Sequence, residues 1–421
     1  MKILPQSKSR PSANSWWQRW SKIGADRWLV SLLSLLIFLI PSNLFLVLHE
    51  QSAYANGIRI DYLIPKLYLS ALVALSFVIL TAAVYKKRLL LLWLALLGIS
   101  IWYNWFFAEL LLAGAVAWSM TQLPKQILQN KQLTWGLVSM IVFQSVVSIA
   151  QFFLQKSLFG YKFLGESDLL HFAGIATQTI GGREFILPSG TTAHPNVLAG
   201  ILVIAGVLLW QRRGDLPRWL ALGTLLVGLI ALILTISLSA WLAAVLAIAF
   251  FLVKNKFDPI QKKLFLIGIW SFAIIIPLTL AQLVQISAHP SLVRRVALNE
   301  VAVANFVQNP IWGTGLNTFT KELSLTNTNK DLERFIQPAH NIPLLTLSEI
   351  GVVGVLAVLG LLIWLQRKNY HPDSLLLASC IAVPLLSLDH YLYTLESGRL
   401  AVAVLLLMVL VKESEKEPDS V

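Results

Sequence analysis

The chain has 421 residues, of which 57% are hydrophobic and only 13% are charged, whereas a soluble domain of this size carries about 25% charged residues. The hydrophobic residues fall in blocks long enough to cross a bilayer as a helix, about 20 residues each. This excludes a soluble enzyme, a disordered chain, a disulfide scaffold and a porin-type barrel, whose strands alternate every second residue. The net charge of +12 is expected to reflect membrane topology rather than nucleic-acid binding.

The apolar blocks predict an all-α fold, a polytopic transmembrane helix bundle of about twelve spans. They cover residues 28–48, 65–84, 89–103, 106–122, 133–155, 192–210, 219–236, 239–253, 264–285, 341–365, 374–388 and 398–411. Two pairs of blocks are short and closely joined, around Asn104 and around Ser239. Positive charge flanks both sides of each pair, which indicates a hairpin rather than one long helix.

Lysine and arginine are concentrated in alternate connections, and this predicts that both termini are cytoplasmic. The expected regions are an amphipathic N-tail (1–27), N-terminal spans (28–134), a second membrane region (135–411) with long outer loops at 156–191 and 286–340 that carry short helices, and a C-tail (412–421). Because functional residues concentrate on loops held by a rigid scaffold, the chemistry is expected on the outer side.

The first long loop contains Gly181-Gly182-Arg183-Glu184 and ends in Ser189-Gly190-Thr191-Thr192-Ala193-His194-Pro195-Asn196, directly before an apolar block. Pro195 suits the first turn of a helix, and a polar residue before it suits the cap. The pattern is typical of an ordinary helix entry, and also of a helix N-terminus that points at an anion.

The second long loop opens with Arg294-Arg295. Apolar residues at helical spacing over 296–307 predict a helix on the membrane surface, which stops at Asn309-Pro310 before Gly313-Thr314-Gly315. The polar stretch 326–330 is expected to form the loop tip. The loop closes with Pro338-Ala339-His340-Asn341 at the next span, where a histidine is either a structural cap or a catalytic base.

Three patterns stand in order along these loops: Gly190-Thr191-x-x-His194-Pro195-Asn196-x-Leu198-Ala199-Gly200, then Asn309-Pro310-x-x-Gly313-x-Gly315-x-x-x-Phe319, then Ala339-His340-Asn341-x-x-Leu344-x-x-x-x-Glu349-x-Gly351-x-x-Gly354. Together with Asp389-His390-Tyr391 before the last block, they resemble the family of O-antigen ligases and O-antigen polymerases. The resemblance covers about residues 135–411.

The resemblance implies a multi-pass glycosyltransferase of the bacterial inner membrane whose site faces the periplasm or exterior. Such enzymes move a glycan from undecaprenyl pyrophosphate to a hydroxyl of lipid A-core sugar, a growing glycan or a protein. They use no metal and no cofactor. Membrane lipids are the other expected partners, and no nucleic acid is.

The resemblance also assigns roles to residues. His340 is the expected base, and Arg294, Arg295 and Arg183 are the expected pyrophosphate ligands, because guanidinium pairs bidentately with phosphate and an ordinary histidine is neutral near pH 7. The expected supporting residues are His194, Asn196, Gly313, Gly315, Asn341, Glu349 and Asp389. Glu349, nine residues after His340, is expected to be a packing or lipid-carrier contact rather than a proton partner.

Two departures from the family pattern concern its arginines. Relatives often carry an arginine just before the Gly-Thr of the first pattern, where this chain has Leu187-Pro188, and Arg183 would have to act from a shifted position. Relatives also often carry Ser-Arg-Gly in the turn of the second hairpin, where this chain has Ser237-Leu238-Ser239. A full set of phosphate ligands is therefore not predicted.

Other functions remain open from the sequence. The same motifs serve ligases and polymerases, so the acceptor is undetermined. Acidic pairs at Glu166-x-Asp168 and Asp331-x-Glu333 have the spacing for a metal-dependent transferase. A lipid-linked glycan flippase also fits twelve spans, although a flippase is expected to carry charge inside its spans and to have short outer loops. An inactive scaffold is the remaining alternative.

Overall fold

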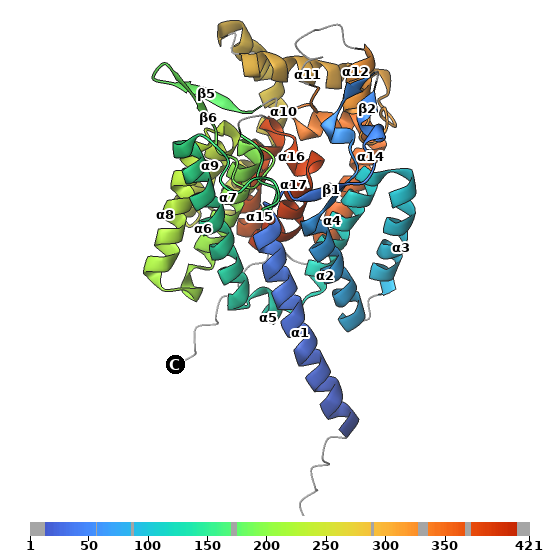
Figure 1. The fold of residues 1–421 in the computed structure, drawn as a ribbon, viewed down its shortest axis with the longest axis vertical. Helices are drawn as coiled ribbons and strands as arrows, with labels where there is room; N and C mark the ends of the chain where they lie inside the picture. Colours follow the sequence, from blue (N-terminus) through green and yellow to red (C-terminus); the bar gives the residue numbers. More distant parts are fainter. Residues whose placement is uncertain are drawn as a thin grey trace, which may run out of the picture.

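The computed structural model describes residues 13–55, 57–85, 88–169, 175–287, 290–326, 336–366 and 372–410. The protein is mostly helical, as predicted, and its helices pack side by side as a bundle (Figure 1). The predicted tails up to residue 12 and from residue 411, and the predicted tip from residue 327, lie outside the described ranges. So do Asp331 and Glu333.

The helices in chain order are α1 (Ala13–Leu39), α2 (Leu69–Tyr85), α3 (Arg88–Tyr103), α4 (Trp105–Gln122), α5 (Lys125–Leu128), α6 (Lys131–Leu154), α7 (Pro195–Gln211), α8 (Arg218–Leu234), α9 (Leu238–Val253), α10 (Pro259–Ser287), α11 (Pro290–Gln308), α12 (Phe319–Thr326), α14 (Ile342–Gln366), α15 (Pro372–Leu388), α16 (Tyr391–Thr394), α17 (Glu396–Leu400) and α18 (Leu407–Leu410). Short 3-10 turns lie at η1 (Gln51–Ala53), η2 (Asp61–Leu63) and η3 (Arg213–Asp215). A π-helical turn, η4 (Ala401–Leu406), precedes α18.

Both short pairs of blocks form two helices each. Asn104 interrupts the first pair with extended backbone, and its side chain accepts a hydrogen bond from the N–H of Phe107, which caps α4. The second pair is interrupted at Ile236, whose φ of 51° is incompatible with a continuing helix. The last block is also divided: it contains the end of α17, η4 and α18, and the short helix α16 precedes it.

Three two-stranded antiparallel sheets interrupt the otherwise helical fold, and none was predicted. They pair β1 (Phe45–Val47) with β4 (Lys66–Tyr68), β2 (Tyr54–Ala55) with β3 (Ile58–Arg59), and β5 (Thr177–Ile180) with β6 (Arg183–Ile186). The first apolar block therefore ends as a helix at Leu39, not near residue 48, because its last residues pair with 66–68 instead of extending the helix.

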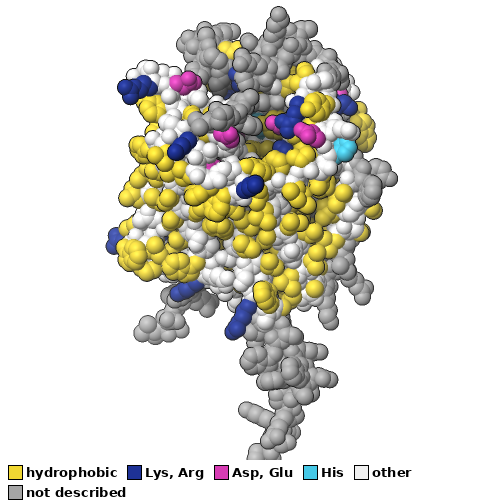
Figure 2. Space-filling model, viewed as in Figure 1, with side chains coloured by type: hydrophobic (Ala, Val, Ile, Leu, Met, Phe, Trp, Pro, Cys, Tyr) yellow, Lys and Arg dark blue, Asp and Glu magenta, His cyan; other side chains and the backbone are white. Residues whose placement is uncertain are grey.

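Two helical stretches in the described part of the chain are long and apolar enough to cross a membrane by themselves: Lys125–Leu154, which covers α5 and α6, and Ile342–Gly360 of α14. Shorter apolar helices of 10–17 residues lie beside them, so a bundle of twelve spans is not established by this criterion. The face drawn in Figure 2 carries a broad band of apolar side chains, with charged side chains above and below it. Such a band is the surface that lipid would contact.

Two apolar cores organise the molecule. The larger lies among the bundle helices and is centred on α7, most of whose residues are buried. The smaller joins Leu298 and Ala302 of α11 to Phe319 of α12 and to Ala339 and Leu345 around the start of α14. The helix predicted over 296–307 is thus part of α11, and its apolar face fixes the second long loop to the bundle.

Candidate active site

The first pattern is held in place by two buried glutamines of α6. Gln151 Oε1 accepts the backbone N–H groups of Ser189 (3.2 Å) and Gly190 (2.8 Å), and its Nε2 donates to the Gly190 carbonyl (2.9 Å). Gln144 Oε1 accepts the N–H of Thr191 (3.0 Å), and its Nε2 donates to the Thr191 hydroxyl (2.7 Å). These amides fix a loop whose backbone could not otherwise be satisfied in an apolar bundle.

The helix entry after this loop forms as the sequence predicts. Pro195 is the first residue of α7, and His194 caps the helix by accepting the N–H of Asn196 at Nδ1 (3.1 Å). Burial, and then the charge of Arg295, lower the pKa of His194 to about 4. His194 is therefore a neutral cap near pH 7.

The first pattern packs against Asp389-His390-Tyr391. Asn196 Nδ2 donates to Asp389 Oδ2 (2.8 Å), a contact between residues 193 positions apart. A Cβ on Gly200 would lie 1.7 Å from the Tyr391 hydroxyl, so a glycine is required for α7 to approach this segment. The two motifs form one unit at one end of α7.

The second pattern packs on a break in α14. Gly351 has φ 60° and ψ −171°, and the N–H of Val352, freed by this kink, donates to the Pro310 carbonyl (2.9 Å). In return the N–H groups of Thr314 (2.9 Å) and Gly315 (2.8 Å) donate to the carbonyls of residues 348 and 349. A Cβ on Gly313 would lie 2.4 Å from the backbone of residue 349. Gly313 and Gly315 thus serve the docking of loop against helix.

Glu349 joins three segments of the chain. Its Oε1 accepts the N–H of Phe319 (3.2 Å), and its Oε2 accepts the hydroxyl of Tyr393 (2.9 Å). These bonds tie α14 to α12 and to α16. The structure therefore gives Glu349 a packing role, with no contact to His340.

His340 lies at the centre of these converging segments. Its neighbour Asn341 caps α14 by accepting the N–H of Leu344 (2.9 Å) and donates to the Ser387 carbonyl (3.2 Å). The His340 ring meets the ring of His390 edge to face, with centroids 4.8 Å apart. The buried Nδ1 of His340 has no hydrogen-bond partner among the described residues. The helix cap is thus Asn341, and the imidazole of His340 is not used for capping.

Arg295 is the positive charge that this cluster shares. It affects the pKa of His194, His340, Asp389 and His390, so its guanidinium lies within coulombic range of all four. Within the described ranges no ion pair or hydrogen bond engages it. Leu298, one helical turn along α11, belongs to the small core that contains Ala339, and this fixes Arg295 relative to His340.

The other two predicted phosphate ligands, Arg294 and Arg183, differ from Arg295 in their position relative to His340. Arg294 also lowers the pKa of His340, as the smallest of five causes, so it lies near the cluster but acts on it less than Arg295 does. Arg183 is exposed and pairs with Ile180 at the tip of the β5–β6 hairpin, which extends away from α16 in Figure 1. The structure does not bring Arg183 to His340.

Burial and positive charge keep the histidines of the cluster neutral. Burial first, and then the charges of His390 and Arg295, hold the pKa of His340 well below its ordinary value. Burial lowers the pKa of His390 to about 3. Burial raises the pKa of Asp389 to about 6, and Arg295 opposes that rise. Because protonated histidines are disfavoured here, net positive charge comes from the arginines, which suits an anionic ligand.

A metal ion is the alternative occupant of this cluster. The ligand atoms of His340, Asp389 and His390 all lie within 4.8 Å of one another. Asp389 Oδ2, however, already accepts from Asn196, and His390 Nδ1 has a hydroxyl partner at 2.7 Å. The charge of Arg295 beside all three groups repels a cation. These contacts favour an anion over a metal.

The acidic pair Glu166-x-Asp168 lies in the first long loop, outside the His340 cluster. There the carboxylate of Glu166 holds the loop together. Its carboxylate accepts Gln151 Nε2 (2.8 Å) and the backbone N–H groups of residues 158–160 (2.6–2.8 Å). With both oxygens occupied by donors of the loop, Glu166 closes a turn rather than presenting a metal ligand.

Two features beside the cluster had no signal in the sequence. The ring of Tyr62 in η2 meets the ring of His390 edge to face, with centroids 5.4 Å apart, so this turn lies beside the site. A buried ion cluster supports the turn that carries His390. There Arg399 pairs with Glu109 and Glu396 (3.6 Å to the latter) and donates to the Tyr393 carbonyl (2.8 Å).

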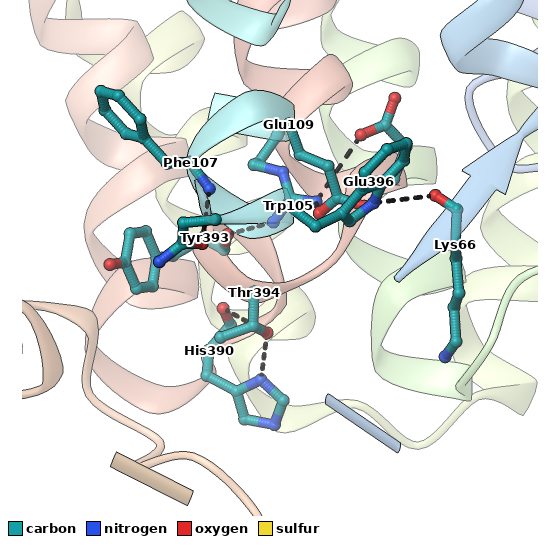
Figure 3. Close-up of polar contacts among 10 residues, drawn as sticks. Lys66, Trp105, Phe107, Glu109, His390, Tyr393, Thr394 and Glu396 are labelled. Atoms are coloured by element: carbon teal, nitrogen blue, oxygen red, sulfur yellow. Dashed lines mark hydrogen bonds and ion pairs between the residues drawn. The ribbon is translucent and has the colours of Figure 1, made fainter. Parts of the chain in front are cut away.

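Figure 3 shows this ion cluster around Glu109 and Glu396, with the hydrogen bond between His390 and Thr394 below it. Trp105 Nε1 donates to both Glu109 (3.0 Å) and the Lys66 carbonyl (3.1 Å), which links the cluster to β4. Buried charges are tolerated only when paired and hydrogen-bonded, and these are. Glu109 lies inside the apolar block 106–122, and the fold brings Arg399 to it as the partner.

The apolar bundle and the histidine–arginine cluster describe a mostly helical protein with apolar outer helices and a cluster of neutral histidines beside arginines at one end. A family model described as O-antigen ligase matches residues 192–359, which include His194, Arg294, Arg295, His340 and Glu349. Over this segment the chain is similar to the O-antigen ligase family, the family that its motifs resemble. Proteins of this family are membrane-integral in bacteria and act on lipid-linked glycans. No curated protein matches the chain.

Proposed function

We propose that this protein moves a glycan from undecaprenyl pyrophosphate to an acceptor hydroxyl by a metal-independent, inverting displacement. The observation that carries the proposal is the pair His340 and Arg295: among the described residues neither the buried Nδ1 of His340 nor the guanidinium of Arg295 has a partner, and the charge of Arg295 acts on His340. A neutral base beside an anion-binding charge is the minimum that such a displacement requires.

The proposed step transfers one glycosyl group and one proton. The acceptor oxygen attacks C1 of the sugar linked to the diphosphate, the bond from C1 to the phosphate oxygen breaks, and its electron pair leaves with undecaprenyl pyrophosphate. His340 takes the proton from the acceptor hydroxyl. Arg295, with Arg294, neutralises the negative charge that grows on the leaving group, and bidentate guanidinium contacts suit phosphate oxygens. Attack opposite the leaving group inverts C1.

The other residues of the cluster position these groups. Asn341 fixes the backbone next to His340 by capping α14, and Asn196 holds Asp389 beside the two histidine rings. The Tyr62 ring packs against His390, which helps to exclude water that would otherwise compete with the acceptor. Arg183 has no place in this arrangement.

The membrane placement belongs to the same proposal. All twelve apolar blocks cross the inner membrane, both termini are cytoplasmic, and the His340 cluster faces the periplasm, where lipid-linked glycans are presented. The exposed apolar band supports this placement. Ligase and polymerase share the donor and the chemistry, so a lipid A-core sugar, a growing glycan and a protein hydroxyl are the acceptors to compare.

The proposal is tested by transfer from a defined undecaprenyl-pyrophosphate glycan with purified protein in nanodiscs and EDTA. His340→Ala is expected to reduce transfer about 10²–10⁴-fold, the usual contribution of a general base, while donor binding persists. His49→Ala, an exposed histidine outside the cluster, is the matched control and should transfer normally. Normal transfer by folded His340→Ala, or loss of activity in EDTA that Mg²⁺ restores, would contradict the proposal.

Arginine variants separate the leaving-group role from the base role. Arg295→Ala is expected to weaken donor binding and rate together, because it removes charge that contacts the diphosphate. Arg295→Lys should recover only part of both, since an ammonium cannot form the bidentate contact. Arg183→Ala should leave donor binding unchanged, and a loss comparable to that of Arg295→Ala would assign the diphosphate to the β5–β6 hairpin instead.

A further inference from the structure

An apolar groove of about 420 Å³ lies among α6, α7, α8 and α9, and its lining includes no residue of the His340 cluster. Helix α7 begins beside that cluster at Pro195, and the groove reaches Trp210 near the other end of the helix. At 1.5 Å per residue, Trp210 lies about 24 Å along the helix from His194. In the proposed membrane orientation, this end of the groove therefore lies in the opposite leaflet.

The groove is hollow because small residues line it. Gly206, Gly228, Ala244 and Ala247 contribute to its wall. A Cβ on Gly206 would meet only one atom, Leu225 Cδ2 at 3.8 Å, which is an ordinary van der Waals distance, so open space remains above this glycine.

The groove also opens at the bundle surface. Three of its lining side chains are strongly exposed: Leu229 by 48%, Ile248 by 56% and Leu252 by 71%. An apolar groove that is open sideways between membrane helices is accessible to a lipid chain rather than to a soluble molecule.

Two aromatic rings and two cations form one end of the groove. The rings of Trp210 and Phe251 lie 6.3 Å apart, Arg213 lies over the Trp210 ring (4.4 Å) and Lys254 lies over the Phe251 ring (5.8 Å). Arg213 Nη1 donates to the Trp210 carbonyl (2.7 Å), which holds the side chain at the mouth. Neither cation forms an ion pair with any residue that the structure describes.

We propose that this groove binds an acyl chain of an anionic phospholipid, with the headgroup phosphate held between Arg213 and Lys254. Charge selects the occupant, because basic residues at the ends of membrane helices attract anionic lipid headgroups. The carrier lipid of the donor is excluded by position, since its diphosphate belongs at Arg295. The site depends on the chain lying in a membrane, and its assignment to a phospholipid rather than to the donor rests on the proposed function.

Native mass spectrometry of the detergent-purified full chain tests the charge at the mouth. Phosphatidylglycerol and phosphatidylcholine with identical chains are titrated in parallel, and phosphatidylglycerol is expected to bind more tightly. Arg213→Gln and Lys254→Gln should each weaken phosphatidylglycerol about fivefold and leave phosphatidylcholine nearly unchanged. Equal binding of the two lipids, unaffected by either variant, would overturn the proposal.

A substitution that fills the groove tests whether the lipid binds there. Gly206→Leu puts a side chain into the hollow and is expected to abolish retention of phosphatidylglycerol at concentrations that saturate the unmodified protein. Gly223→Leu on α8 is the matched control, because nothing lies within 4 Å of a Cβ there and Gly223 does not line the groove. Unchanged lipid binding by Gly206→Leu would overturn the assignment.

Two further outcomes of the lipid-binding experiments also have a definite meaning. If Gly206→Leu does not fold, the charge variants still decide, because Arg213 is exposed and belongs to neither apolar core. Displacement of bound phosphatidylglycerol by a polyprenyl diphosphate in the unmodified protein would also overturn the proposal, because it would assign the groove to the donor. Loss of transfer activity in His340→Ala has no bearing on any of these outcomes.

Discussion

The pKa of His340 determines the pH at which the proposed base is available. Burial and the neighbouring charges lower that pKa, so the imidazole of the free enzyme stays neutral below pH 6.5. We expect kcat/KM to be on its plateau at pH 6.5 and to fall only at lower pH, as His340 becomes protonated. Measurement of kcat/KM between pH 4.5 and 8 checks this, and a midpoint above 6.5 would contradict it.

The variant Arg295→Gln tests whether the charge of Arg295 contributes to the lowered pKa of His340. Removing this positive charge relieves one of the effects that lower the pKa of His340, so the midpoint of the residual activity should move to higher pH. A midpoint that stays fixed while the rate falls would mean that Arg295 acts on the leaving group without influencing the base.

Single residues of the cluster were predictable only where a motif carried them. His340, Asn341 and Asn196 stand in patterns with fixed spacing at helix entries, which is a local feature of the sequence. Tyr62 and Arg399 have no such context, because they acquire their roles from chain segments hundreds of residues away. A buried arginine in an apolar block can be noticed, but its partner is defined only by packing.

At the scale of elements, the break in α14 is the feature on which the second loop depends. Gly351 has a φ/ψ combination open only to glycine, and a Cβ there would lie 2.3 Å from the Ile311 carbonyl oxygen. Gly351→Ala is expected to destabilise the protein by roughly 1–3 kcal/mol from backbone strain alone, and to reduce transfer because the loop carrying Gly313 is displaced.

Thermal unfolding in detergent measures this effect, with Gly360→Ala as the control in the same helix. Nothing lies within 4 Å of a Cβ on Gly360, so that substitution should leave the midpoint unchanged or raise it slightly. Equal midpoints for the two variants would show that the kink is not required.

Helical elements were predictable from apolar blocks, and the strands were not. An apolar run such as residues 45–47 looks like the continuation of a helix, and only its pairing with residues 66–68 makes it a strand. The same limit applies to the last block, where the ion pairs of Arg399 accompany a division into short helices that hydropathy alone does not reveal. Hydropathy reports burial in an apolar medium but not the tertiary partner.

At the scale of the whole molecule, hydrogen bonds between inter-helix connections that are distant in sequence show which connections lie at the same end of the bundle. Arg212, after α7, donates to the carbonyls of Leu128 (2.6 Å) and Asn130 (2.9 Å), so the connections at 123–130 and 212–217 lie together. At the other end, the N–H of Asn43 donates to the carbonyl of Thr191 (3.0 Å), which joins the segment after α1 to the loop that leads into α7. The sequence predicted the same grouping from charge alone.

This grouping makes the predicted topology testable with reporter fusions. Positive charge retains connections in the cytoplasm, so fusions at the basic end should report inside, and fusions at the end that carries His340 should report outside. The inside set is after Arg88, Arg213, Lys256 and Lys412, and the outside set is after Ser157, within 326–330 and after Asp389. Because Arg212 ties two inside connections together, they must report the same side. An inside result at 326–330 would place the loop between Arg295 and His340 in the cytoplasm, away from any periplasmic glycan, and would remove the basis for the proposed transfer.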